Sequence, residues 1–95
     1  MNTQVTKQKV NFIGIHYLDL IAKMISQGGR ISNLIVDQTD ESINVSFNVE
    51  FNENMTIIKE KLVYENNMLM LWKVTTTEGE RIIFSREQLN LYLNS

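Results

Sequence analysis

The chain has 95 residues, a formal net charge of −2 and no cysteine. This length suits a single small globular domain over residues 1–95. The lack of cysteine excludes disulfides and thiolate metal sites, and the scattered charges of both signs argue against a strongly basic nucleic-acid binder. The first residues lack the apolar core of a signal peptide, and no apolar run could span a bilayer. We therefore expect a cytoplasmic protein with no membrane partner.

The first third of the chain predicts a loose arm followed by one helix. Residues 1–9 are mostly polar, which is typical of a loose N-terminal arm. From Phe12 onward apolar residues recur with the period of a helix, and His16 falls on the polar side. Asn11 is a candidate N-cap, a start nearer His16 is the alternative, and Gly28-Gly29 marks the C-terminal end. The apolar side carries Ile13, Tyr17, Leu18, Leu20, Ile21, Met24 and Ile25.

Five β-strands are predicted after this helix. The clearest runs from Ser42 to Asn52, where apolar and polar residues alternate without a break, so that one face is apolar and the other is wetted. Asn66-Asn67 suits a two-residue hairpin turn, because asparagine tolerates a positive φ at both central positions. Glu78-Gly79 predicts a second tight turn. The other strands are expected at 31–37, 56–65, 68–77 and 80–84.

Ser85 begins a short C-terminal helix with a full local signature. Ser85 and Gln88 form a capping box, while Phe84 and Leu89 can form a hydrophobic staple. The fold class is therefore α+β, with an N-terminal helix, a five-stranded mainly antiparallel meander sheet and a short C-terminal helix. No motif assigns the chain to a family. The apolar side of the last helix carries Leu89, Tyr92 and Leu93.

The turns also predict which strand residues share a face, because a hairpin turn fixes the register. With the turn at Asn66-Asn67, Glu60 lies opposite Lys73 and forms a cross-strand ion pair at the rim of the core. A two-residue loop at Glu53-Asn54 pairs apolar residues with apolar ones, and the N-terminal helix covers the resulting face. The core residues on the third and fourth strands are then Leu62, Tyr64, Leu69 and Leu71.

The opposite face is the candidate binding site. It combines large apolar side chains with basic ones at its border, and such a surface is usually covered. Three covers remain open: the C-terminal helix, a protein partner or second copy, and a nucleic acid stacked on Trp72 with phosphates on the lysines. The residues of this predicted site are Trp72, Met70, Val74, Ile83, Lys59, Lys61 and Arg81.

No group of residues predicts catalysis, a cofactor or a metal site. His16 is the only histidine, so common zinc sites cannot be built. We predict a non-enzymatic protein-interaction module, a small regulator or inhibitor that works through the face around Trp72 and forms a homodimer. Weak binding of single-stranded nucleic acid on that face is the alternative. Frequent Asn and Ile without Pro is typical of AT-rich genomes, including those of bacterial phages and mobile elements.

Overall fold

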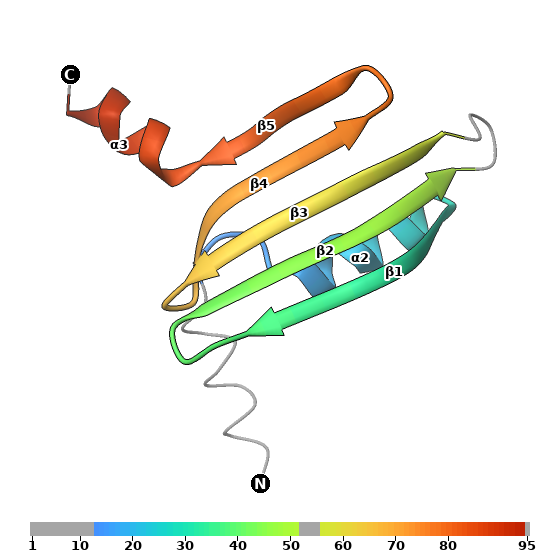
Figure 1. The fold of residues 1–95 in the computed structure, drawn as a ribbon, viewed down its shortest axis with the longest axis horizontal. Coiled ribbons are helices and arrows are strands. Elements are labelled where there is room, and N and C mark those ends of the chain that lie inside the picture. Colours follow the sequence, from blue (N-terminus) through green and yellow to red (C-terminus); the bar gives the residue numbers. More distant parts are fainter. Residues whose placement is uncertain (1–12, 52–55, 95) are drawn as a thin grey trace, which may run out of the picture.

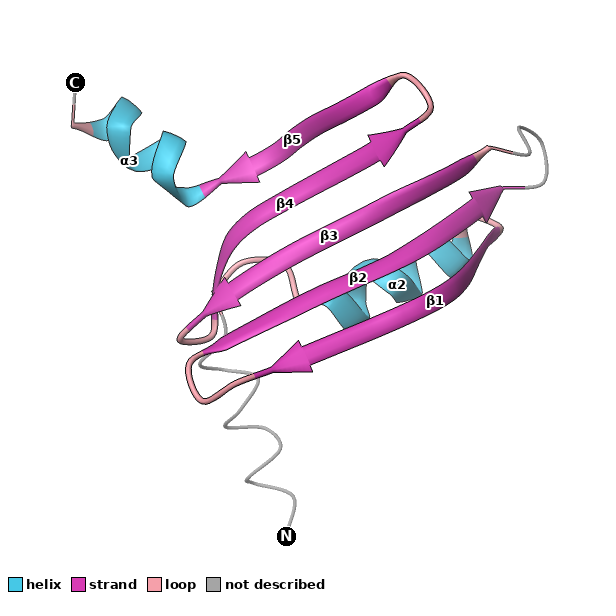
Figure 2. Ribbon diagram, in the orientation of Figure 1, coloured by secondary structure: helices cyan, strands magenta, loops and turns pink. Residues whose placement is uncertain are grey.

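The computed structural model describes residues 13–51 and 56–94. Its five strands form one open antiparallel sheet in the order of the chain (Figure 1). The predicted α+β class, with a helix before and after the sheet, is confirmed (Figure 2). The predicted arm at 1–9, the cap at Asn11 and the loop at 53–54 lie outside the described residues. The elements are α2 (Tyr17–Ser26), β1 (Gly29–Gln38), β2 (Ser42–Phe51), β3 (Ile57–Glu65), β4 (Met68–Thr76), β5 (Gly79–Ser85) and α3 (Arg86–Leu93).

Helix α2 begins at Tyr17, later than the periodicity alone predicts. His16 is its N-cap, and the imidazole Nδ1 accepts a hydrogen bond from the Leu18 N–H at 3.1 Å. The imidazole also stacks on the Tyr17 ring with centroids 4.6 Å apart. The expected surface histidine is therefore a half-buried part of the helix start. Past the helix end, Gly28 has a φ of +94°, in agreement with the predicted stop.

The pairing of β3 with β2, and with the start of β4, has the register that the sequence predicts. Asn66 and Asn67 have φ values of 53° and 63°, as a type I′ turn requires, and this confirms the predicted turn. Across β2 and β3, Val45 lies opposite Leu62, so apolar residues pair with apolar ones as predicted. Across the start of the β3–β4 pair, Glu65 lies opposite Met68. The strict alternation of β2 thus places its apolar residues on one face.

Beyond those positions, three register shifts change the predicted faces. In β4 the extra residue is Met70, because Tyr64 and Val63 pair with residues on either side of it. In β5 the extra residue is Ile83, and in β1 the shift falls between Ser32 and Ile35. An extra residue makes a β-bulge, which inverts the alternation of side chains beyond it.

The predicted Glu60–Lys73 pairing is therefore wrong. Glu60 lies opposite Val74, and Lys73 lies opposite Lys61. The predicted turn at Glu78-Gly79 would place Val74 opposite Ile83. This pairing is also wrong, because the last turn falls one residue early, at 77–78, and Val74 lies opposite Arg81. The first correction also moves Trp72 to the face that carries the core, because Trp72 lies opposite Leu62.

The core lies between α2 and the face of β2, β3 and the start of β4. Tyr64 is fully buried there, and its hydroxyl donates to the Ile15 carbonyl at 2.8 Å. Burial raises the pKa of this phenol, so it stays a hydrogen-bond donor. The buried hydrophobic cluster consists of Leu20, Val45, Phe47, Leu62, Tyr64 and Leu69.

A short segment before α2 lies beside the start of β4. Ile13 forms a parallel bridge with Met68, donating to the Asn67 carbonyl and accepting from the Leu69 N–H, both at 2.9 Å. Gly14 follows with a φ of +96°, and a Cβ there would lie 2.7 Å from the Leu69 Cβ. Glycine is thus required by both conformation and space at this close approach.

Candidate functional site

The sheet has two faces of different character. The helix face, on which α2 packs, carries Val45, Phe47, Leu62 and Tyr64. Figure 1 shows α2 behind β1 and β2 on this side. The opposite face carries lysines on β3 and β4, and we call it the lysine face. Side chains on the two faces cannot form one site, because the sheet separates them.

The structure divides the predicted site residues between the two faces. Trp72 pairs with Leu62, and Val74 pairs with both Glu60 and Arg81, so Trp72, Val74 and Arg81 share the helix face. Lys59 and Lys61 pair with polar residues of β2 on the lysine face. Met70 and Ile83 are the extra residues of the two bulges. The predicted single surface is thus not formed, although the predicted role of each residue in partner binding stays a prediction.

Trp72 is held in the helix face by a buried carboxyl group. Its indole Nε1–H donates to Glu60 Oε1 at 2.8 Å, and Glu60 is only 4% exposed. Burial raises the pKa of Glu60, while the hydrogen bond from Trp72 lowers it by a smaller amount. Lys73, the predicted partner of Glu60, instead forms an ion pair with Glu80 at 3.1 Å.

The helix face continues across β4 and β5, but its side chains there are less buried than those of the core. Trp72 and Phe84 pack against the core cluster but are only half-buried, and they lie opposite each other. Val74 is also half-buried, and Arg81 is exposed. We call this part of the helix face the open half, defined by Trp72, Val74, Arg81 and Phe84.

Helix α3 starts as its capping signature predicts. Ser85 is the N-cap, and its Oγ accepts from the Gln88 N–H at 3.3 Å. Arg86 fixes the first turn to β4, because its Nε and Nη2 atoms both donate to the Leu69 carbonyl, at 3.3 and 3.2 Å. The Arg86 guanidinium also lies over the Phe84 ring, 4.9 Å from the centroid.

Beyond this anchored start, α3 is not seated on its own sheet. The helix contains no buried residue and projects past the end of β5 (Figures 1 and 2). Leu91, Tyr92 and Leu93 are 68%, 77% and 67% exposed. The C-terminal helix of the same chain is one of the three covers expected for Trp72. In the structure it does not bury its own apolar residues on the sheet.

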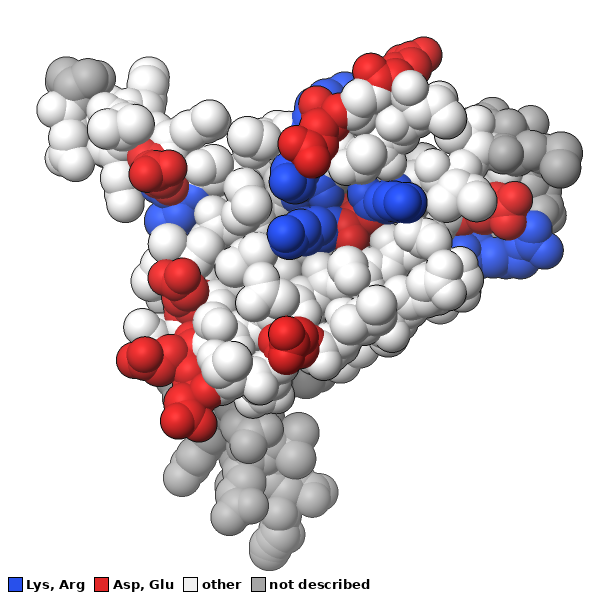
Figure 3. Space-filling view, viewed as in Figure 1, with Lys and Arg blue, Asp and Glu red and all other residues white. Residues whose placement is uncertain are grey.

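The lysine face gathers positive charge near its centre (Figure 3). Lys61 and Lys73 lie directly opposite each other on β3 and β4, and Lys59 is two residues from Lys61 on the same face. Like charges in this arrangement repel, and Glu80 offsets only the charge of Lys73. Trp72 lies on the other face, so no described tryptophan provides a stacking platform beside these lysines.

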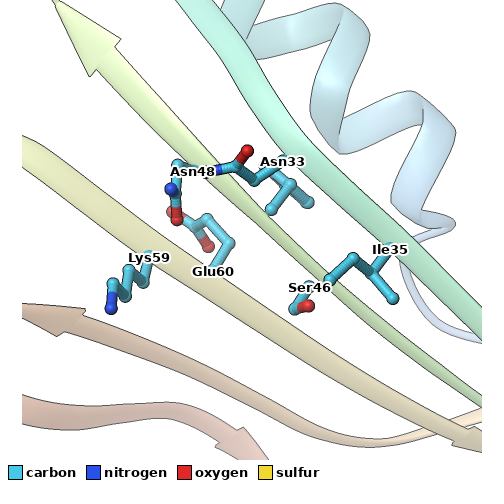
Figure 4. Close-up of a pocket in the computed structure, with 7 residues that line it drawn as sticks. Asn33, Ile35, Ser46, Asn48, Lys59 and Glu60 are labelled. Atoms are coloured by element: carbon cyan, nitrogen blue, oxygen red, sulfur yellow. The ribbon is translucent and has the colours of Figure 1, made fainter.

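A shallow depression adjoins the lysines (Figure 4). Its volume is about 440 Å³, and Figure 4 shows residues of β1, β2 and β3 around it. The amide, hydroxyl and ammonium groups at its rim can bind polar or anionic groups. Nothing in this arrangement aligns a nucleophile with a general base. The lining residues are Asn33, Ile35, Ser46, Phe47, Asn48, Lys59 and Glu60.

Within 13–51 and 56–94, no three His, Cys, Asp or Glu side chains gather where they could hold a metal ion. None of the helices in the same ranges is long and apolar enough to cross a membrane. Comparison with known proteins finds no match to any protein family, curated protein or solved structure.

Sequence reasoning missed two residues that shape this end of the molecule, and it gave a third, Glu60, the wrong partner. Arg86 acts through a backbone carbonyl, which leaves no pattern in the sequence. Leu91 lies off the apolar side of the predicted helix, yet it is among the most exposed apolar residues. Glu60 gave a usable signal, because a carboxyl group on an apolar strand face needs a hydrogen-bond donor nearby.

Proposed function

We propose that the protein is a non-enzymatic interaction module that binds a protein partner with the end of the molecule formed by α3 and the open half. It acts as a small regulator or inhibitor in the cytoplasm. The observation that carries the proposal is the exposure of Leu91, Tyr92 and Leu93 on a helix with no buried residue. Large exposed apolar side chains gathered at one end of a molecule are typical of a protein-interaction site.

The surrounding residues support the same proposal. Trp72 and Phe84 are aromatic, half-buried and held in place by Glu60 and Arg86. Rigid aromatic side chains supply large contact area at a small entropic cost, and arginine and tryptophan are favoured anchors of interfaces. A partner that covers this end would therefore meet a pre-formed surface.

The test compares captured proteins between two double variants. Leu91→Asp/Leu93→Asp places charges on α3, while the control Leu18→Asp/Ile25→Asp places the same charges on exposed sites of α2, where both native residues are 55% exposed. Each chain is immobilised, incubated with extract of the cells that make it, and analysed by mass spectrometry. The α3 variant should lose proteins that the wild type and the control retain. Equal capture by both variants would rule out α3 as the contact surface.

A second candidate function is binding of single-stranded nucleic acid or another polyanion on the lysine face. It is favoured by one observation, the direct opposition of Lys61 and Lys73. Such binding would weaken steeply with salt, because neutralising phosphates releases counterions. Titration with an oligonucleotide at two salt concentrations tests this function, with Lys61→Gln as the variant expected to weaken binding. Tight, salt-sensitive binding that Lys61→Gln reduces would favour this candidate over the interaction module.

A further inference from the structure

Helix α3 is too short to be stable by itself. It has eight residues, and isolated helices of fewer than about 12 residues are marginal in water even with favourable sequences. In proteins most helical stability comes from packing of an apolar side. The Ser85 cap and the Arg86 anchor hold only its first turn. Its later residues, Leu91 to Leu93, therefore need a surface to pack on.

The open half of the same chain is an incompletely covered apolar surface. On the helix face, α2 packs over the buried cluster of β2, β3 and the start of β4, whereas the open half on β4 and β5 leaves Trp72, Val74 and Phe84 only partly buried. The dimensions fit, because α3 is about 12 Å long and about 10 Å wide, and two neighbouring strands are about 10 Å wide with their side chains. One helix can therefore cover the two strands.

The anchor at Arg86 keeps α3 from covering its own open half. Both Arg86 hydrogen bonds go to the Leu69 carbonyl, at the start of β4, and they direct the helix past the end of the sheet. A helix held in that direction can instead reach a neighbouring molecule. On a second copy of this chain, this helix meets an open half whose apolar side chains are also incompletely covered.

We infer that two copies of the chain form a two-fold dimer in which α3 of each copy packs on the open half of the other. This inference rests on the proposed function and names a second copy as the partner. In a two-fold dimer each contact occurs twice, because α3 of the first copy packs on the second copy and α3 of the second copy packs on the first. Every copy then buries one helix and one open half, and no apolar surface of either kind is left over.

Charges on the two surfaces are complementary. Arg81 is exposed on the open half, and Glu87 is exposed in the first turn of α3. The ion pairs among residues 13–51 and 56–94 are Arg30–Glu50 and Lys73–Glu80, so neither Arg81 nor Glu87 has an ionic partner within that part of the chain. In the dimer, Glu87 of one copy lies at the rim beside Arg81 of the other.

The two surfaces contribute unequally to the contact area. Stable dimers bury about 800 Å² on each partner. Each copy contributes two surfaces, so each surface has to bury about 400 Å² on average. Leu91, Tyr92 and Leu93 on α3 are each at least 67% exposed. Trp72, Val74 and Phe84 on the open half keep only part of their surface exposed, so α3 supplies the larger share of the contact area.

The first experiment is sedimentation equilibrium of the full chain. The wild type should be a dimer at micromolar concentration, and Leu91→Asp/Leu93→Asp should raise the dissociation constant by about tenfold or more. The control Leu18→Asp/Ile25→Asp should leave it unchanged. Arg81→Glu and Glu87→Arg should each weaken the dimer by about twofold to fivefold, and the two together should restore it. Far-ultraviolet circular dichroism confirms that all variants are folded.

Cross-linking then tests which surfaces meet. The natural chain has no cysteine, so introduced pairs are specific. A chain with Leu91→Cys, mixed with one carrying Val74→Cys and oxidised, should give a covalent dimer of the two. A chain with both substitutions should also link to a second copy. A monomeric product with an internal disulfide would overturn the inference, because α3 would then cover its own sheet.

Other occupants of the open half give different results. A wild type that stays a monomer at high micromolar concentration overturns the inference. If the α3 variant still loses captured proteins, the proposed function stands with a foreign partner. If the α3 substitutions change neither the mass nor the captured proteins, the proposed function fails as well. A monomer in which acrylamide does not quench Trp72 would mean that another segment of the same chain covers the open half, and this also overturns the dimer.

Discussion

The two halves of the helix face differ in how completely they are buried. Under α2, Val45, Phe47 and Val49 are at most 1% exposed. On β4 beyond Leu69, and along all of β5, no residue is buried. Strands lie about 4.8 Å apart, so the outer axes of five strands are about 19 Å apart, whereas a helix is about 10 Å wide. One short helix can therefore close only part of this sheet, and the rest needs another cover.

The largest expected difference between the halves concerns their phenylalanines. Phe47→Ala should lower the free energy of unfolding by about 3–5 kcal/mol, because it leaves a cavity in the buried cluster. Phe84→Ala should lower it by a smaller amount, about 1 kcal/mol, since that ring is only partly buried. Urea unfolding in dilute solution, where the chain is monomeric, measures both. Equal losses would show that the open half is as tightly packed as the part under α2.

An intermediate effect is expected at the boundary of the two halves, where Glu60 meets Trp72. Burial raises the pKa of Glu60 above its ordinary value of 4.5, so the folded chain holds this proton more tightly than the unfolded chain does. The contribution of Glu60 to the free energy of unfolding should therefore be largest at acidic pH. It should fall as the pH rises above 4.5 and through the raised pKa.

Glu60→Gln provides the measurement for this prediction. Its amide oxygen can still accept from the Trp72 indole, but the side chain no longer ionises. Urea unfolding at a series of pH values should show a smaller fall for the variant than for the wild type. Emission of Trp72, the only tryptophan, should follow the same titration in the wild type alone. Identical pH profiles for the two chains would contradict the assignment.

The smallest effect is expected on α3. Leu91 is 68% exposed, so Leu91→Ala should change the free energy of unfolding of the monomer by no more than about 0.5 kcal/mol. The same unfolding experiment, at a concentration below that of self-association, measures it. A loss well above 1 kcal/mol would mean that α3 packs within its own chain, and the contrast between the two halves would disappear.

The sequence predicted best where its alternation is strict or its turn chemistry is specific. In Ser42–Phe51 every second residue is apolar, which determines both the strand and its buried face. Asn66-Asn67 and the Ser85 cap were predicted because each position requires a particular conformation or side-chain acceptor. These features are local, so a single sequence is sufficient to identify them.

The candidate site was predicted less well because it depends on bulges. Residues 68–72 read Met-Leu-Met-Leu-Trp, an unbroken apolar run in which alternation cannot show which residue is extra. The extra residue Met70 moves Trp72 to the helix face and leaves Lys61 and Lys73 opposite each other. Neither bulge has a glycine or another conformational marker. The direction of α3 was equally hidden, since it depends on a carbonyl that any residue at position 69 would offer.

The bulges also determine where the gene can change length. Met70 and Ile83 are surplus to the pairing of their strands, so loss of either codon would leave every other cross-strand partner in place. Loss of a codon for a regularly paired residue such as Lys73 would instead turn the rest of β4 over, bringing Val74 to the lysine face. Single-residue deletions at Met70 and Ile83, both in the strands that carry the open half, should therefore preserve the pairing of this sheet.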